Sequence, residues 1–171
     1  PKQGEMGVAP GLPEGARLRM LGALNDCVAA YASGGNFTLE GSAGDLFGAW
    51  NNGGNISAER DVGSFLAHGM ASGRVTVRDG AKDDAGSCMS GGILLIRGDA
   101  GRRTGAGMSG GTIVVHGDVG REPGVGMTGG RVIINGRCPS PPEGVKMSTL
   151  SAAEAKKLNA EIGDSTLEVP N

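Results

Sequence analysis

Apolar and polar residues alternate in short runs that recur along the chain every nineteen residues. We number the positions of each repeat from a recurring glycine, which is position 0: Gly35, Gly54, Gly73, Gly92, Gly111 and Gly130. Position 2 holds Phe37, Ile56, Val75, Leu94, Ile113 and Val132, and position 4 holds Leu39, Ala58, Val77, Ile96, Val115 and Ile134. Position 5 is polar in all six copies. This alternation predicts one strand per repeat with one buried face.

A fixed period near twenty residues is typical of a solenoid, in which each repeat forms one coil and buries its apolar face against its neighbours. Two further columns fit the interior of such a coil. Position 8 is small and apolar in Ala43, Val62, Ala81, Ala100, Val119 and Cys138, and position 16 becomes Met70, Met89, Met108 and Met127. We therefore expect an all-β fold, a single-stranded parallel β-helix of about six 19-residue coils over residues 33–147.

The segment before the first glycine column divides into two parts. Residues 1–17 are rich in proline and glycine, which predicts a flexible arm that orders only on contact with a partner. Residues 18–32 carry apolar residues spaced as on one helical face, namely Leu18, Leu21, Val28 and Tyr31. We expect a short helix there that covers the first coil, because an exposed β-helix end is a sheet edge.

The chain after the last coil predicts a second helix within residues 148–171. Ser151 and Glu154 have the spacing of a capping box, in which each side chain bonds the other residue's backbone N–H. Leu158 and Ile162 follow on one face of the expected helix. We expect this helix to cover the other end of the solenoid, and the remaining residues to form a tail.

Composition narrows the classes of function. The formal net charge of −2 gives no general reason to expect nucleic acid or an anionic membrane as a partner. The chain contains neither an apolar run long enough for a membrane span nor a signal-peptide pattern. Its three cysteines, Cys27, Cys88 and Cys138, form no Cys-x-x-Cys pair, so we expect reduced thiols and a cytoplasmic location.

The reactive residue types do not assemble into a catalytic site. His68 and His116 occupy positions 14 and 5, which project from different sides of a coil. Cys88 has no basic neighbour in sequence that would activate its thiol. Position 7 carries a column of carboxylates, Asp61, Asp99 and Asp118. Each of these either caps its own turn, which we favour, or joins the others in binding a cation.

Charge is unevenly distributed along the expected coils. Acidic residues gather in the early coils, whereas arginines gather in the late coils, among them Arg97, Arg102, Arg103 and Arg121. Arg102 and Arg121 share position 10, so we expect them to stack one coil apart and to repel each other. A counter-charge on a partner protein would offset that repulsion, and so would a nearby acidic residue of this chain. We therefore take these four arginines as the candidate docking residues.

The joints between coils resemble those of a known β-helix family. Residues 105–111 and 124–130 share the pattern Gly-(Ala/Val)-Gly-Met-(Ser/Thr)-Gly-Gly, and residues 41–49 read Gly-Ser-Ala-Gly-Asp-Leu-Phe-Gly-Ala. This GxGxG family comprises the C-terminal domain of the glutamate synthase large subunit, the third subunit of split glutamate synthases, and the C subunit of formylmethanofuran dehydrogenase. The resemblance covers about residues 33–147 and implies a right-handed coil.

The resemblance implies that this chain carries no catalytic residue, cofactor or metal of its own. Flavin, iron–sulfur or molybdopterin and tungstopterin groups would belong to partner subunits. We expect a non-catalytic scaffold subunit of a multisubunit glutamate-synthase-like amidotransferase and oxidoreductase. The alternatives are a C-type subunit of a formylmethanofuran dehydrogenase or formyltransferase/hydrolase complex, and a stand-alone structural β-helix. The expected partners are proteins rather than nucleic acid or membrane, and a homo-oligomer is left open.

Overall fold

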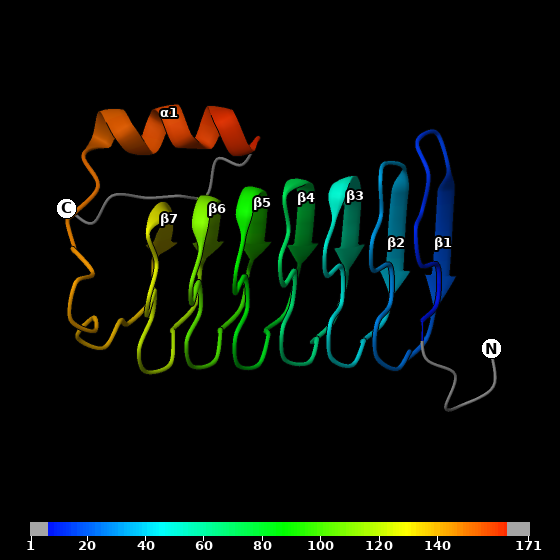
Figure 1. Ribbon diagram of the computed structural model, residues 1–171, viewed down its shortest axis with the longest axis horizontal. Coiled ribbons are helices and arrows are strands. Elements are labelled where there is room, and N and C mark those ends of the chain that lie inside the picture. The colour runs from blue at the N-terminus through cyan, green and yellow to red at the C-terminus, as the bar shows by residue number, and fades with distance from the viewer. Residues whose placement is uncertain (1–6, 164–171) are drawn as a thin grey trace.

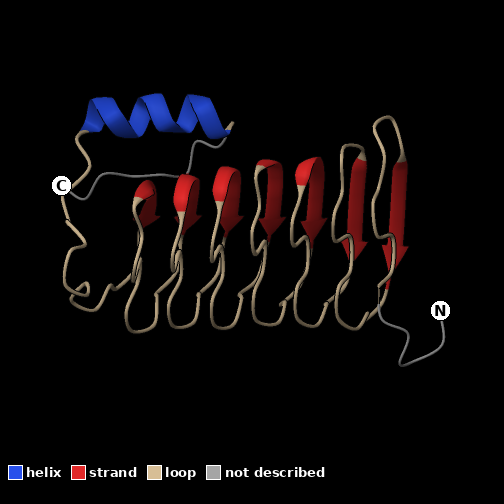
Figure 2. Cartoon of the chain, in the orientation of Figure 1, coloured by secondary structure: helices blue, strands red, loops and turns tan. Residues whose placement is uncertain are grey.

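The computed structural model describes residues 7–163, which form a β-solenoid of seven parallel strands and one helix (Figures 1 and 2). The strands follow one another in a single sheet in chain order. They are β1 (Arg17–Leu21), β2 (Asn36–Glu40), β3 (Asn52–Ala58), β4 (Ser72–Val77), β5 (Ser90–Ile96), β6 (Ser109–Val115) and β7 (Gly129–Ile134), followed by α1 (Ala152–Ile162). The predicted solenoid of about six turns is thus confirmed, whereas the hand of the coil stays a prediction.

The strand register follows the nineteen-residue period. Phe37 pairs with Ile56, and Ile56 pairs with Val75, so position 2 of one coil lies on position 2 of the next. From β2 to β6, the side chains at positions 2 and 4 are fully buried. The first three methionines of position 16 are fully buried as well, which makes that column part of the core. At the opposite corner, position 8 links coils through isolated bridges such as Ala81 to Ala100.

The expected helix over residues 18–32 is wrong, because the solenoid begins one coil earlier. β1 pairs with β2 in the same register, with Leu18 opposite Phe37 and Met20 opposite Leu39. Leu18 and Met20 therefore occupy positions 2 and 4 of this first coil, where Met20 packs against the core and Leu18 remains exposed. The physical reason is that a parallel strand next to β2 pairs with the backbone N–H and C=O groups at the edge of β2 and also buries Phe37. A helix at the end of the solenoid would do both less completely.

Most of the expected flexible arm also belongs to the solenoid. The backbone N–H of Gly7 donates to the carbonyl of Asp26 at 3.0 Å, and that of Ala29 donates to the carbonyl of Val8 at 2.8 Å. Leu12 is buried in the core. Residues 7–16 thus form half a coil that stacks on the first complete one, and residues 1–6 of the arm lie outside the described residues.

The C-terminal helix forms as predicted but packs elsewhere. The capping box of Ser151 and Glu154 is present, and Leu158 and Ile162 are buried. However, α1 lies along the outer face of the last strands rather than over the end of the solenoid (Figure 1). Its apolar side packs against the outward-facing position 3 of β5, β6 and β7, which holds Leu95, Val114 and Ile133. The tail after residue 163 lies outside the described residues.

Candidate functional site

The aspartates at the corners tie successive coils together. Oδ1 of Asp61 accepts a hydrogen bond from the backbone N–H of Gly80 at 2.8 Å, and Asp99 accepts one from Asp118 at 2.7 Å. Each carboxylate therefore caps the coil that follows it, rather than its own turn. In the column of position 7, Gly80 stands between Asp61 and Asp99, so these two carboxylates do not lie in adjacent coils. Among residues 7–163, no group of three or more histidine, cysteine or acidic side chains is arranged to hold a metal ion.

Two of the four candidate docking arginines are held by carboxylates of the preceding coil. A terminal guanidinium nitrogen of Arg102 lies 3.0 Å from Oδ2 of Asp83, and one of Arg103 lies 2.5 Å from Oδ2 of Asp84. The backbone N–H of Arg102, together with its guanidinium, lowers the pKa of Asp83. The hydrogen bond to Asp84 raises the pKa of Arg103. The counter-charge for Arg102 is thus provided within the chain, by Asp83.

The other two arginines differ from this pair. Arg97 and Arg121 are exposed in the late coils. The carbonyl of Arg121 accepts the backbone N–H of Arg103 at 2.9 Å, which joins their coils through the main chain. Arg102 and Arg103 thus stabilise contacts between coils, and a docking role of the four arginines stays a prediction.

The histidines and cysteines do not combine into a catalytic arrangement. Nδ1 of His68 lies 2.7 Å from Oγ of the buried Ser87, and Nδ1 of His116 lies 3.3 Å from the Asn135 amide on another side of the coil. A histidine and a serine without an orienting acid lack a component of the usual triad, and no contact between His68 and a carboxylate occurs among the described residues. Burial raises the pKa of the Cys138 thiol, and Cys88 is exposed.

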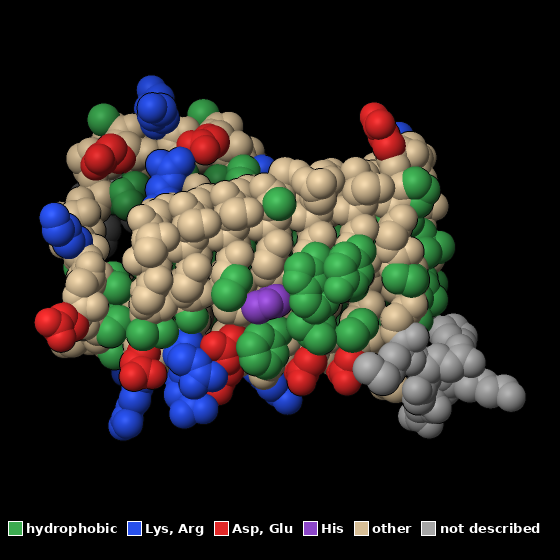
Figure 3. Space-filling model, viewed as in Figure 1, with side chains coloured by type: hydrophobic (Ala, Val, Ile, Leu, Met, Phe, Trp, Pro, Cys, Tyr) green, Lys and Arg blue, Asp and Glu red, His purple; other side chains and the backbone are tan. Residues whose placement is uncertain are grey.

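Sequence reasoning missed a cluster of aromatic side chains on the outer surface, which we call the aromatic platform: Tyr31, Trp50, Phe65 and His68. The rings of Tyr31 and Trp50 are stacked, with centroids 4.7 Å apart and planes inclined by 8°. His68 makes edge contacts with Trp50 at 5.5 Å and with Phe65 at 5.8 Å. Figure 3 shows an apolar patch with a histidine at its border on this face. The missed signal was the presence of large side chains at position 15 in Tyr31 and Trp50, where three of the four later coils have glycine.

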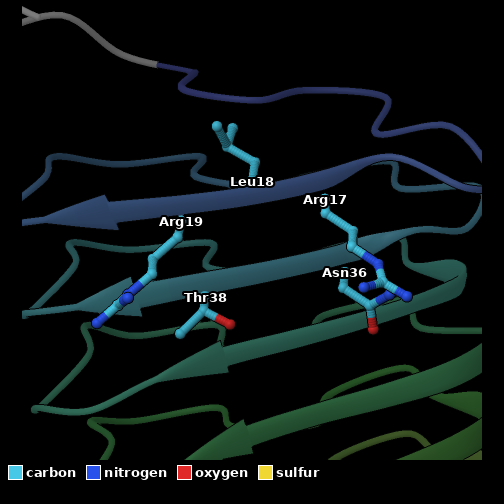
Figure 4. A pocket seen from close by; sticks show the side chains of 5 residues that line it. All are labelled: Arg17, Leu18, Arg19, Asn36 and Thr38. Atoms are coloured by element: carbon cyan, nitrogen blue, oxygen red, sulfur yellow. The ribbon is translucent and has the colours of Figure 1, made fainter.

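A shallow pocket lies on a different side, on the outer face of the first two strands (Figure 4). It is lined by Arg17, Leu18 and Arg19 of β1 and by Asn36 and Thr38 of β2. Arg19 forms an ion pair with Glu40, which lies at the end of β2. The pocket brings together cationic and neutral polar groups, without a nucleophile and base in contact.

Comparison with known proteins identifies no relative of this chain. No family model, no curated protein and no solved structure matches the chain. None of the helices in the described part of the chain has the length and apolar character needed to cross a membrane. The chain is therefore defined by its fold, a β-solenoid whose candidate site is an outer surface rather than a cavity.

Proposed function

We propose that this protein is the non-catalytic scaffold subunit of a cytoplasmic, multisubunit, glutamate-synthase-like amidotransferase and oxidoreductase. The single observation that supports this is the repeated joint of residues 105–111 and 124–130, which recurs with the same spacing in successive coils. In the family that these joints resemble, the β-helix packs against catalytic modules and carries no chemistry itself. Any flavin, iron–sulfur cluster or pterin then belongs to the partner subunits.

The physical properties of the solenoid suit a scaffold. Its interior is filled from β2 to β6, so recognition must use outward positions. Neighbouring strands are spaced by about 4.8 Å, which places those positions on a rigid and regular grid. Catalytic subunits bound to such a grid keep a fixed separation. In an amidotransferase this matters, because ammonia released at one site must reach the next without being lost to water.

Affinity purification of the tagged chain from its native host, followed by mass spectrometry, tests the proposal. We expect stoichiometric recovery of a glutaminase chain and of a synthase chain that binds flavin. Recovery of molybdopterin and amidohydrolase chains would instead support the formylmethanofuran dehydrogenase alternative. Recovery of the chain alone would support a stand-alone β-helix. Glutaminase activity of the purified, isolated chain would contradict a non-catalytic role.

A further inference from the structure

The aromatic platform concentrates nearly all of the aromatic surface of the protein. The chain contains five phenylalanine, tyrosine and tryptophan residues in total. Phe37 and Phe47 are fully buried in the core. The other three, Tyr31, Trp50 and Phe65, all belong to the platform, where Tyr31 is 58% exposed and Phe65 is 38% exposed. Exposed aromatic clusters of this kind mark interaction sites, because tyrosine and tryptophan dominate binding energies at interfaces.

The backbone conformation shows that the fold does not need these side chains. Tyr31, Trp50 and Phe65 have φ values of 57°, 53° and 57°, in the left-handed region that disfavours residues with a Cβ. Position 15, which Tyr31 and Trp50 occupy, is glycine in three later coils. The solenoid therefore closes this corner without an aromatic residue. Position 11, which Phe65 occupies, has the same left-handed conformation with other residue types, such as Leu46 and Glu122. The fold therefore requires an aromatic ring at neither position.

The geometry of the rings determines what the platform can bind. Tyr31 and Trp50 stack face to face, so their facing surfaces are already covered. The far side of the indole lies over Gly69, where a Cβ atom would be only 2.8 Å from Cδ1 of Trp50. The contact between His68 and Ser87 holds the imidazole between Trp50 and Phe65. The platform thus presents the exposed side of Tyr31, ring edges and the Phe65 ring. This apolar surface suits the apolar side chains of a polypeptide.

Carboxylates border the platform. Asp26 and Asp45 immediately precede Cys27 and Leu46 and use Oδ1 to accept the backbone N–H of the following coil, at 2.8 and 2.7 Å. Neither takes part in an ion pair between described residues, and the same holds for Asp61. In contrast, the corresponding Asp83 of a later coil is neutralised by Arg102. Figure 3 shows acidic side chains along the edge next to the apolar patch.

We propose that the aromatic platform binds a polypeptide segment of a partner subunit that carries apolar residues flanked by arginine or lysine. The apolar residues contact Tyr31, Trp50 and Phe65, and the basic residues pair with Asp26 and Asp45. This inference rests on the proposed scaffold function and gives its partner a chemical description. It also places the docking surface on the early coils rather than at the late arginines.

The protein contains its own reporter for this binding, because Trp50 is its single tryptophan. Two matched synthetic peptides serve as probes, one with a Leu-Pro-Leu-Leu core between pairs of arginines and the other with the same core between pairs of glutamates. We expect the arginine peptide to shift Trp50 emission saturably at physiological salt. The glutamate peptide should bind at least about tenfold more weakly. No saturable shift with the arginine peptide up to millimolar concentration would overturn the proposal.

Variants separate the contributions of the rim and the rings. Asp26→Asn with Asp45→Asn keeps the acceptor oxygens that cap the coils, and should remove the preference for the arginine peptide. Phe65→Asn should weaken binding of that peptide about tenfold or more. Glu122→Asn is the matched control, since Glu122 has the same coil position as Phe65 and a φ of 59° but lies three coils away. Equal affinities of the Phe65 and Glu122 variants would overturn the assignment.

Two further measurements test other occupants of the surface. Titration with cellohexaose should leave Trp50 emission unchanged, and a saturable response to the sugar alone would replace the peptide by a carbohydrate. Sedimentation should show that the wild-type chain forms no dimer through this surface. A dimer through this surface would be present in the wild type and lost in Phe65→Asn. Such a dimer would identify a second copy as the occupant and overturn the partner assignment.

Reconstitution with the purified partner distinguishes a failure of this inference from a failure of the proposed function. If the wild-type chain recovers no partner from its host, the scaffold function itself fails. If a partner is recovered, Tyr31→Gly with Phe65→Asn should weaken its binding about tenfold or more, while Glu122→Asn should not. Unchanged binding of that partner to the double variant would overturn the docking site and leave the scaffold function standing. Circular dichroism and melting of each variant confirm that it folds.

Discussion

At the scale of single residues, the two glycines at each joint have different tasks. A Cβ atom on Gly110 would lie 2.3 Å from the carbonyl oxygen of Ser90, so this position needs glycine for close approach between coils. Gly111 has a φ of 88°, and a Cβ atom there would lie 2.9 Å from the carbonyl carbon of Gly91. Gly111 therefore needs glycine both for its backbone conformation and for space.

We predict that Gly111→Ala destabilises the protein more than Gly126→Ala does. Gly126 also has a positive φ, of 69°, but a Cβ atom there meets no neighbour within 4 Å. The conformational penalty of about 1–2 kcal/mol applies to both variants, and the clash with the neighbouring coil adds to it only at Gly111. Urea unfolding of the two variants measures the difference. Equal losses would show that the backbone of the neighbouring coil moves away at no cost.

Asn51 stands at position 16, where a change to the methionine of the later coils should destabilise the protein rather than stabilise it. It is fully buried at position 16, where later coils have methionine. Its amide donates to the carbonyl of Gly54 and accepts the N–H of Gly54, both at 2.8 Å. We predict that Asn51→Met lowers the free energy of unfolding by about 1–3 kcal/mol, because it leaves buried backbone groups unpaired. A gain in melting temperature would contradict this.

The corner aspartates make stability depend on pH. A backbone N–H of the next coil, donated by Arg102 to Asp83 and by Arg137 to Asp118, lowers the pKa of each carboxyl below the ordinary 3.8. A depressed pKa stabilises the folded state above the unfolded value, and that contribution is lost as pH falls through the folded value. We predict that the melting temperature of the wild-type chain decreases when the pH is lowered below about 4. In the double variant Asp83→Asn with Asp118→Asn, the decrease in melting temperature should be less steep. Parallel melting curves would contradict this prediction.

At the scale of elements, the outward side chains of the strands decide where the helix packs. Position 3 is polar in the early coils, with Thr38, Ser57 and Thr76. It becomes aliphatic in β5, β6 and β7, where Leu95 and Val114 are buried beneath α1. An apolar stripe on a helix needs a matching apolar surface, and the late strands alone provide one. Arg131 of β7 adds an ion pair at 3.0 Å with Glu161 of α1.

We predict that Val114→Asp releases α1 from the sheet and leaves the solenoid folded. A carboxylate beneath Leu158 and Ile162 would be buried without a partner, at a cost that exceeds the docking energy of a single short helix. Hydrogen exchange of residues 152–162 should become fast, while β2 to β5 remain protected. Thr76→Asp is the control, because Thr76 has the same position on β4. Loss of protection throughout the sheet would contradict independent docking.

At the scale of the whole molecule, the two ends of the solenoid are unequal. β1 and β7 each pair on one side only, but Leu18 of β1, which occupies position 2, is 37% exposed. The opposite half of the sheet is covered by α1 (Figure 1). Because each coil of a solenoid contacts mainly its neighbours, the ends need not share the stability of the middle.

We predict a gradient of hydrogen-exchange protection along the solenoid. β1 should exchange fastest of the seven strands, because it pairs on one side only, like β7, but is not covered by α1 as β7 is. β5 and β6 should exchange slowest, since each is paired on both sides and is covered in part by α1. Exchange mass spectrometry with peptides that resolve the strands measures this order. Uniform protection would mean that the solenoid opens as one unit.

The sequence by itself determined the coil length, the inward columns and the helix cap. These features follow from local periodicity: a strand that buries one face requires apolar residues at positions 2 and 4, and Ser151 caps its own helix within one turn. The spacing of Leu18 and Tyr31 nevertheless predicted a helix that does not form. A short segment contains too few residues to distinguish the helical period of 3.6 from the strand period of 2.

Only the tertiary structure decided what the outward positions do. Whether Arg102 faces solvent or pairs with Asp83 depends on which side chains lie one coil away, since that distance in space corresponds to nineteen residues of sequence. The same holds for the stacking of Tyr31 on Trp50 and for the packing of α1 on Leu95 and Val114. Inward residues are constrained by burial in every coil, whereas outward residues acquire a role only from the neighbours that the fold brings beside them.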